Sequence, residues 1–126
     1  MVVLDSRFKN WKPPKMKHGI STKWNWIPFY PHHIKIGKFT DIGALTLLFG
    51  QYGIEIGNYV QIGAGCILYS ENTENNTHGK IIIREKAKIG AHSIIFPNVI
   101  IEAEERIPAK SIVYVNKKNE RVIKRC

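Results

Sequence analysis

The chain has 126 residues, of which 44% are hydrophobic, and a formal net charge of +9. This length fits one domain, and the apolar content is enough for a core, which excludes wholesale disorder. A run of about 18 apolar residues, which a membrane-spanning helix would need, does not occur. Two cysteines, Cys66 and Cys126, do not make a disulfide framework. They fit a reducing compartment, and we expect a cytoplasmic protein.

Basic residues concentrate at the two ends of the chain. Residues 7–23 hold six lysines and arginines and no acidic residue, and residues 116–126 hold five. Such a surplus is either an ordinary solvated surface or a site for an acidic partner, such as nucleic acid, a membrane surface or a phosphate-bearing small ligand. No helix-turn-helix or zinc-finger motif accompanies the charge, so we expect no nucleic-acid partner.

Residues 1–33 form the first expected segment. They carry no repeat and are dense in proline and aromatic residues, and the prolines argue against a long helix. Repeat structures need a cap over their first turn. We expect this segment to be that cap, and its covering side chains to be Trp24, Trp26, Phe29 and Tyr30.

Residues 34–115 follow a period of six. The longest series of aliphatic residues at this spacing is Ile83, Ile89, Ile95, Ile101, Ile107 and Val113, and shorter series precede it at Ile36, Ile42 and Leu48 and at Ile56, Ile62 and Leu68. Six is not a helical period, but it fits a strand that ends in a corner, because alternate residues of a strand face the same way. We expect the glycines after the aliphatic residues to turn these corners, since positive φ costs glycine little.

Three such sides would close one turn of about eighteen residues, with β-sheet bonding between turns. The sequence therefore predicts an all-β protein, a left-handed parallel β-helix of about four to five turns. Its first turn would lie under the aromatic and proline-rich cap. Residues 116–126 would follow the helix as a basic tail.

Residues 69–80 interrupt the repeat with a polar run that contains His78. Leu68 and Ile83 are fifteen residues apart, whereas two regular sides would take twelve. The composition predicts a loop that leaves the helix. Chemistry is often placed on loops that a rigid scaffold holds in position.

The repeat resembles the hexapeptide-repeat acyltransferases. The matching stretches are IGKFTDIGALT, IEIGNYVQIGAGCIL, IIIREKAKIGAHSIIFPNVII and the ending ERIPAKSIVYVNKKNERVIKR. Within this family, the sequence most resembles the small sugar O- or N-acetyltransferases of bacterial surface polysaccharide synthesis. The resemblance implies acetyl-CoA as the donor, a sugar or nucleotide-linked sugar as the acceptor, and direct transfer within a ternary complex. It also implies a homotrimer with its active sites between neighbouring subunits.

The same resemblance implies a histidine that acts as general base. His78, in the loop, is one candidate, because an imidazole suits this work near neutral pH. His92, at an outward corner, is the other, and it would act as base or orient the acceptor beside His78 of an adjacent chain. Both histidines also fit ordinary surface positions. Candidates for binding sugar hydroxyls are Asn72, Glu74 and Asn76.

Acetyl-CoA would lie along the later turns. Backbone groups near Ala91 and Ser93 would hold the pantetheine arm, as the resemblance implies. The phosphates would meet Lys110, Lys117 or Lys118, because lysine serves phosphate as a point charge. Cys66 occupies an inward small position and is expected to be a core residue rather than a nucleophile.

Two other functions are open to this sequence. A non-catalytic trimeric scaffold or assembly module is possible, because solenoids bind partners along extended faces. A metal-dependent enzyme like the gamma-class carbonic anhydrases is less favoured. Those enzymes use histidines five apart on one turn, whereas His78 and His92 are fourteen apart. We therefore expect no metal.

Overall fold

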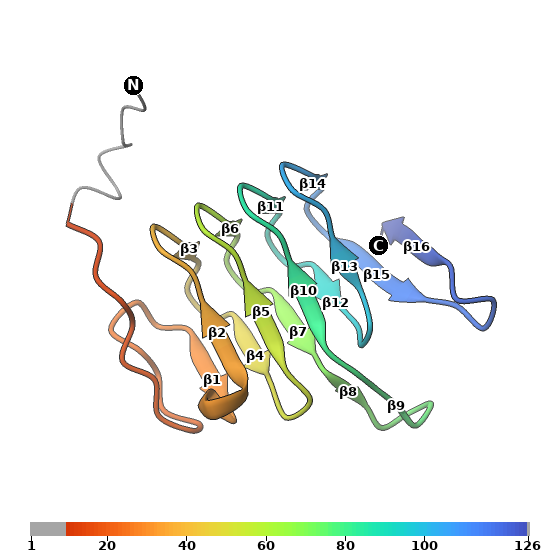
Figure 1. Ribbon diagram of the computed structural model, residues 1–126, viewed down its shortest axis with the longest axis horizontal. Helices are drawn as coiled ribbons and strands as arrows, with labels where there is room; N and C mark the ends of the chain where they lie inside the picture. Colours follow the sequence, from red (N-terminus) through yellow and green to blue (C-terminus); the bar gives the residue numbers. More distant parts are fainter. Residues whose placement is uncertain (1–9, 126) are drawn as a thin grey trace.

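The computed structural model describes residues 10–125, which form a parallel β-helix of about four turns (Figure 1). Successive turns stack along one axis, so that strands of neighbouring turns pair in parallel and in register. Three sheets make the three faces of the helix, which we number in the order in which the chain enters them. The all-β helix expected from the period of six is confirmed.

Face 1 is a six-stranded sheet in the order β1-β4-β7-β12-β15-β16. Its parallel strands are β1 (Ile27–Phe29), β4 (Leu47–Phe49), β7 (Ile67–Tyr69), β12 (Ile94–Ile95) and β15 (Ser111–Val115). Only β16 (Arg121–Arg125) runs the other way, because the chain turns back after β15.

Faces 2 and 3 have four strands each, all parallel. Face 2 consists of β2 (Ile34–Ile36), β5 (Ile54–Ile56), β10 (Ile81–Ile83) and β13 (Ile100–Ile101). Face 3 consists of β3 (Asp41–Ile42), β6 (Gln61–Ile62), β11 (Lys88–Ile89) and β14 (Arg106–Ile107). A short 3-10 helix, η2 (Pro31–His33), leads from β1 into β2.

The core is a column of aliphatic side chains that point inward from all three faces. The predicted series is buried from Ile42 to Val113, with side chains at most 6% exposed, while Ile36 in the first turn is partly buried. Each buried aliphatic side chain stabilises the fold by about 1.5–3 kcal/mol relative to an exposed one. Cys66 lies in this column, fully buried, as expected.

The corners turn in a different way from the one expected. The glycines that follow the aliphatic residues, such as Gly63 and Gly90, do not have positive φ. The left-handed residue stands two places later, for example Phe39, Tyr59 and His92. The glycines are needed because neighbouring turns approach closely there. A Cβ on Gly90 would lie 2.3 Å from the nitrogen of Ala109.

The first turn begins earlier than the sequence predicts. Strand β1 already pairs with β4 in register from Ile27, whereas the repeat was expected to start at residue 34. Trp26, only 2% exposed, closes the open end of the core. Trp11 donates a hydrogen bond from its indole nitrogen to the carbonyl oxygen of Thr40 at 2.9 Å. Of the four expected covering side chains, only Trp26 is buried: Trp24 and Tyr30 are exposed, and Phe29 stacks on Phe49 on the outside of face 1.

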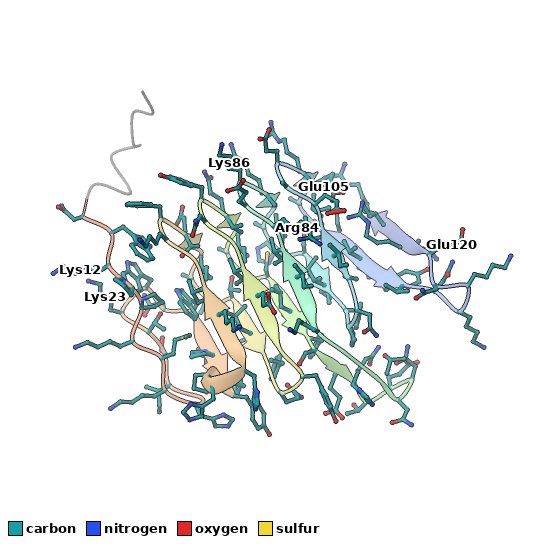
Figure 2. The ribbon with its side chains drawn as sticks, in the orientation of Figure 1. Lys12, Lys23, Arg84, Lys86, Glu105 and Glu120 are labelled. Atoms are coloured by element: carbon teal, nitrogen blue, oxygen red, sulfur yellow. The ribbon has the colours of Figure 1, made fainter. Side chains whose placement is uncertain are left out.

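The basic C-terminal segment adds a strand. The turn after β15 brings β16 back along the edge of face 1. Arg121 donates to a carboxylate oxygen of Glu105 at 2.7 Å and to the carbonyl oxygen of Ile100 at 3.0 Å. Glu105 and the turn residue Glu120 are labelled in Figure 2. The contact between Arg121 and Glu105 ties the C-terminal segment to the last full turn.

The polar run forms a β-hairpin that projects from the helix (Figure 1). Its strands are β8 (Glu71–Asn72) and β9 (Thr77–His78), which pair antiparallel. It leaves from the corners between faces 1 and 2, residues 30–33, 50–53, 70–80 and 96–99, which we call the hairpin edge. The corners between faces 3 and 1, residues 43–46, 63–66, 90–93 and 108–110, form the His92 edge. These two edges flank face 1.

Candidate active site

His78 lies on the hairpin with its ring stacked on Tyr52. The ring centroids are 4.4 Å apart with an angle of 17° between the planes. Both side chains are exposed. Tyr52 belongs to the preceding turn of the hairpin edge, so the stack joins the hairpin to the body of the helix. The imidazole is held at the surface of the edge by this contact.

The hairpin has two different sides, because side chains of a strand alternate. Glu71 and His78 are directly opposite each other and face residues 51 and 52: Gln51 donates to Glu71 at 3.2 Å. Asn72 and Thr77 form the next pair and line a cleft with Asn98. The expected base and the expected sugar ligand Asn72 therefore lie on opposite sides of the hairpin. Glu74 and Asn76 are exposed in its turn, and neither lines this cleft.

A small basic hollow of about 200 Å³ lies on the His78 side of the edge. Its lining includes His32, His33, Lys35, Tyr52, Glu55 and Lys80. Lys80 donates to a carboxylate oxygen of Glu55 at 2.6 Å, and this hydrogen bond lowers the pKa of Glu55. The register of successive corners, which stacks residues 30–33 beside 50–53, was the sequence signal for this grouping.

His92 stands at the other edge of face 1. It is exposed, its φ is 59°, and its backbone N–H donates to the carbonyl oxygen of Ala64 at 2.9 Å. A Cβ on Gly65 would lie 2.7 Å from its Nδ1, so glycine leaves room for the imidazole. His78 and His92 thus belong to different edges of the same chain.

The residues expected to bind acetyl-CoA divide into three groups. Ala91 and Lys110 are both on the His92 edge, where the Lys110 N–H donates to the Ala91 carbonyl oxygen at 2.9 Å. Ser93 is fully buried, and its hydroxyl donates to the carbonyl oxygen of Pro108 at 3.2 Å. Lys117 and Lys118 lie in the turn between β15 and β16, away from that edge.

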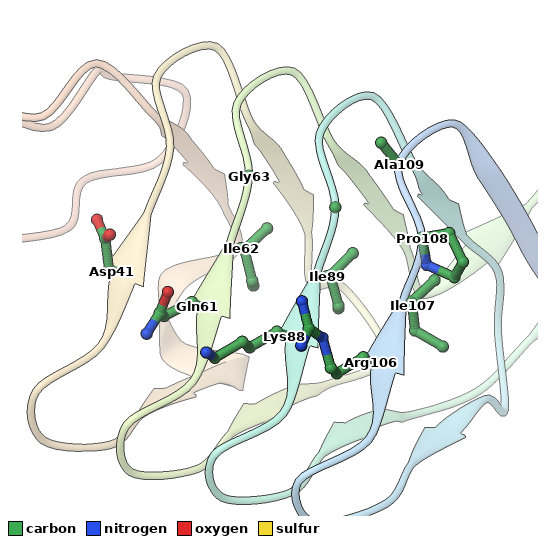
Figure 3. A pocket seen from close by; sticks show the side chains of 11 residues that line it. Asp41, Gln61, Ile62, Gly63, Lys88, Ile89, Arg106, Ile107, Pro108 and Ala109 are labelled. Carbon is green, nitrogen blue, oxygen red and sulfur yellow. The ribbon is translucent and has the colours of Figure 1, made fainter.

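A polar groove runs across face 3 beside the His92 edge (Figure 3). It has a volume of about 470 Å³. Its floor carries one polar residue from each turn, Asp41, Gln61, Lys88 and Arg106, and its side includes Gly90 and Ala109. Lys88 and Arg106 are in register on neighbouring strands, which gives the C-terminal half of the groove a positive charge. Lys88 and Arg106 directly precede the core residues Ile89 and Ile107, so the period of six already indicated that they point outward.

Face 1 is apolar on its outside. Its outward residues between the corners include Ile27, Leu47, Ile67, Ile94 and Ile112. A ladder of stacked rings runs beside them through Phe29, Phe49, Tyr69 and Phe96, with centroids 4.6–5.8 Å apart. The corresponding positions on face 3 are polar or charged. Contiguous apolar surface of this kind marks an interaction site.

Other chemistry finds little support in the described part of the chain. Among residues 10–125, no group of three histidine, cysteine or acidic residues could hold a metal ion. Burial raises the pKa of the Cys66 thiol, and its sulfur donates to the carbonyl oxygen of Gly90 at 3.2 Å, so it is a poor nucleophile. No helix within residues 10–125 is long and apolar enough to cross a membrane.

Acyltransferases are among the solved structures with this fold. A hexapeptide-repeat-containing acetyltransferase from Vibrio cholerae, VCA0836, solved with acetyl-CoA, aligns with a TM-score of 0.59 and 20% identity. The alignment covers 79% of this chain and 63% of that one. AntD, an N-acyltransferase from Bacillus cereus solved with dTDP and 3-hydroxybutyryl-CoA, aligns with a TM-score of 0.54 and 23% identity over 83% of this chain and 79% of that one.

A variant of AntD that holds dTDP-4-amino-4,6-dideoxyglucose and coenzyme A aligns with a TM-score of 0.51 at 23% identity, over 83% of this chain and 79% of its own. No protein-family model and no curated protein sequence matches the chain. The chain spans less than two thirds of the Vibrio cholerae structure. The chain therefore has the fold of the hexapeptide-repeat acyltransferases, the class that its repeat predicted.

Proposed function

We propose that the protein is an acetyl-CoA-dependent acyltransferase that acylates a sugar or nucleotide-linked sugar for surface polysaccharide synthesis in the cytoplasm. The observation that carries this proposal is the arrangement around face 1. This apolar face is flanked on one side by the hairpin edge, which bears His78, and on the other by the His92 edge. The His92 edge adjoins the polar groove on face 3. The fold shared with acyltransferases of known ligands supports the same reading.

The proposed site would combine groups from more than one copy of the chain. Within one chain the two edges lie on opposite borders of face 1, so His78 and the groove belong to different sites. A ring of subunits that pack through face 1 is a heterologous assembly that closes on itself. In such a trimer, the hairpin edge of one subunit meets the His92 edge of the next. The site would then combine His78 of one chain with the groove of its neighbour.

Acetyl-CoA would occupy the groove on face 3 and the adjoining His92 edge. Lys88, Arg106 and Lys110 would meet its phosphates, because charge-assisted contacts to phosphate are among the strong hydrogen bonds. Backbone groups near Ala91 would hold the pantetheine arm. A backbone N–H near the thioester would stabilise the oxyanion of the tetrahedral intermediate. Lys117 and Lys118, in the β15–β16 turn, are less suited to this groove.

The transfer would need one proton acceptor. The acceptor hydroxyl or amine attacks the thioester carbonyl, and an imidazole takes its proton as the new carbon–oxygen or carbon–nitrogen bond forms. The tetrahedral intermediate then collapses, and the coenzyme A thiol leaves with a proton. His78 is our first candidate for the base, because Tyr52 fixes its ring beside the basic hollow. His92 is the alternative.

Calorimetry with acetyl-CoA tests the donor assignment. We expect micromolar binding to the native protein and at least tenfold weaker binding to Lys88→Ala and Arg106→Ala, since each change removes about 1.5–3 kcal/mol of charge-assisted contact. His78→Ala and His92→Ala should still bind acetyl-CoA. Coenzyme A release, measured with a panel of sugar acceptors, should then be lost in the variant that lacks the base.

The result that would sink the proposal is no acetyl-CoA binding by the native protein at any soluble concentration. If the protein were still a trimer under the same conditions, the apolar face would remain the best-supported feature. A non-catalytic scaffold would then be the better description. The same titration therefore separates the two functions.

A further inference from the structure

A third hollow, distinct from the basic one and from the groove on face 3, lies between the hairpin and the C-terminal turn. It has a volume of about 360 Å³, within the range of small-molecule sites at about 300–1,000 Å³. Three segments distant in sequence form it: the hairpin, the corner after β12, and the end of β15 with the turn that follows. In Figure 1 the hairpin and this turn project on the same side of the helix. We call it the asparagine cleft.

Neutral amides dominate the lining of the asparagine cleft. Its asparagines are Asn72, Asn75, Asn98, Asn116 and Asn119. Thr77 adds a hydroxyl, and the rings of Phe96 and Tyr114 add apolar surface. None of the described residues that line it carries a charge. The two other hollows described above, by contrast, are lined by lysine, arginine or histidine.

This composition matches one ligand chemistry. A carboxamide offers two donors and an acceptor, and a sugar hydroxyl is both donor and acceptor, so the two pair in either direction. A pyranose also has an apolar C–H face that packs on aromatic surface, which Phe96 and Tyr114 contribute to the lining. A phosphate or carboxylate would find no compensating cation among these lining residues. The cleft therefore favours an uncharged polyol.

Two of the amides, those of Asn98 and Asn116, are held in place before any ligand arrives. Asn98 donates from Nδ2 to the carbonyl oxygen of His78 at 3.2 Å, which joins the β12 corner to the hairpin. A Cβ on Gly79 would lie 1.8 Å from Asn98 Oδ1, so only glycine allows this approach. Asn116 Oδ1 accepts from the backbone N–H groups of Lys118 and Glu120, each at 2.9 Å. Preorganised polar groups lower the cost of binding.

We propose that the asparagine cleft binds a neutral saccharide unit, at a position separate from the acyl-transfer site. The separation follows from the hairpin, which turns Asn72 and Thr77 toward the cleft and the His78 ring toward Tyr52. A sugar in the cleft is therefore not the unit that His78 of the same chain would deprotonate. It anchors a neighbouring unit of a longer acceptor, and this binding does not require acetyl-CoA.

Saturation-transfer NMR with methyl glycosides of glucose, galactose, mannose, rhamnose and N-acetylglucosamine tests the proposal. We expect at least one of them to bind the native protein, and the best one is then titrated by calorimetry. Asn119→Gly keeps the backbone at φ 64° and removes one amide, so its affinity should fall by about fivefold. Gly79→Ala should abolish binding, because it displaces Asn98.

One variant serves as a matched control. Asn25→Gly makes the same change at φ 67° on an exposed residue at the far end of the helix, and its affinity should equal that of the native protein. The proposal is overturned if no glycoside binds, or if Asn119→Gly binds the glycoside as tightly as Asn25→Gly. Failure of acetyl-CoA binding would instead count against the acyltransferase and leave this result standing.

Discussion

The corner glycines show how single residues set the spacing between turns. In this helix the left-handed conformation falls on residues such as Tyr59 and His92, while the glycines two places earlier have ordinary φ. What they lack is a Cβ, which would meet the backbone of the next turn. A strand that pairs in register cannot move away from such a contact without loss of its hydrogen bonds.

Gly90→Ala should therefore destabilise the protein strongly. Its Cβ would lie 2.3 Å from the Ala109 nitrogen, and we expect a loss of about 2–3 kcal/mol in the free energy of unfolding, as for overpacked sites. Gly19→Ala is the comparison, because its φ is +69° but its Cβ would meet only Phe29, at 3.6 Å. We expect about 1 kcal/mol there. Urea unfolding measures both, and a loss for Gly90→Ala no larger than that for Gly19→Ala would contradict close approach as the reason for glycine at position 90.

Prediction from sequence at the residue scale succeeded where a rule is local and repeated. Residues such as Ile62, Leu68 and Ile89 were assigned to the core because each recurs at six and each strand alternates its sides. The corner conformation was predicted wrongly. Positive φ was assigned to the corner glycines, whereas it falls on the residue two places later. Lys88 and Arg106 were not among the predicted site residues, which lay in the loop, the corners and the tail. Both hold the outward position before a core residue.

At the scale of elements, the hairpin and β16 are the two additions to the regular helix. The hairpin was predicted as a loop from its composition and from the fifteen-residue spacing. Its two-sidedness was not predictable, since it depends on which residues of β8 and β9 pair. β16 was predicted as a tail, because five scattered basic residues do not reveal that Arg121 finds Glu105 on another turn.

The pairing of Arg121 with Glu105 predicts a pH dependence. The guanidinium hydrogen bond lowers the pKa of Glu105 below its ordinary value. A lowered folded pKa contributes stability above the ordinary pKa of about 4.3, and this stability is lost as the pH falls through the folded value. Glu105→Gln should cost about 0.5–1 kcal/mol at pH 7, a modest value because the pair is partly exposed.

The measurement is urea unfolding at pH 7 and at pH 3. The difference in unfolding free energy between native protein and Glu105→Gln should shrink at the lower pH. Glu102→Gln is a suitable control, because its partner Arg84 lies on an exposed surface and both side chains are more than half exposed. A difference for Glu105→Gln that stays constant with pH would contradict the role given to this ion pair.

At the scale of the whole molecule, face 1 is the proposed contact between copies of the chain. Ile67→Asp places a charge in the centre of this apolar face and should convert the proposed trimer to monomers. Ile82→Asp makes the same change at a half-buried outward position on face 2, one side further along the same turn, and should leave the trimer intact. Sedimentation velocity distinguishes these states. A trimer that survives Ile67→Asp would place the interface elsewhere.

The arrangement of subunits could be predicted from the sequence only in part. The period of six gave the helix, and the resemblance implied a trimer with shared sites. Neither could say that His78 and His92 fall on the two borders of one apolar face, because this depends on the number of residues in every intervening corner. That placement gives the implied shared site a definite geometry.

Mixing two inactive variants tests this geometry most directly. His78→Ala removes the hairpin-edge contribution, and Arg106→Ala removes the groove contribution of the other edge. Each variant alone should release little coenzyme A with an accepted sugar, at an acetyl-CoA concentration well below the dissociation constant of Arg106→Ala. If the variants are unfolded and refolded together in equal amounts, every mixed trimer contains one intact site, and about a quarter of the native activity should return. No recovery in refolded trimers of proven mixed composition would contradict a site shared between subunits.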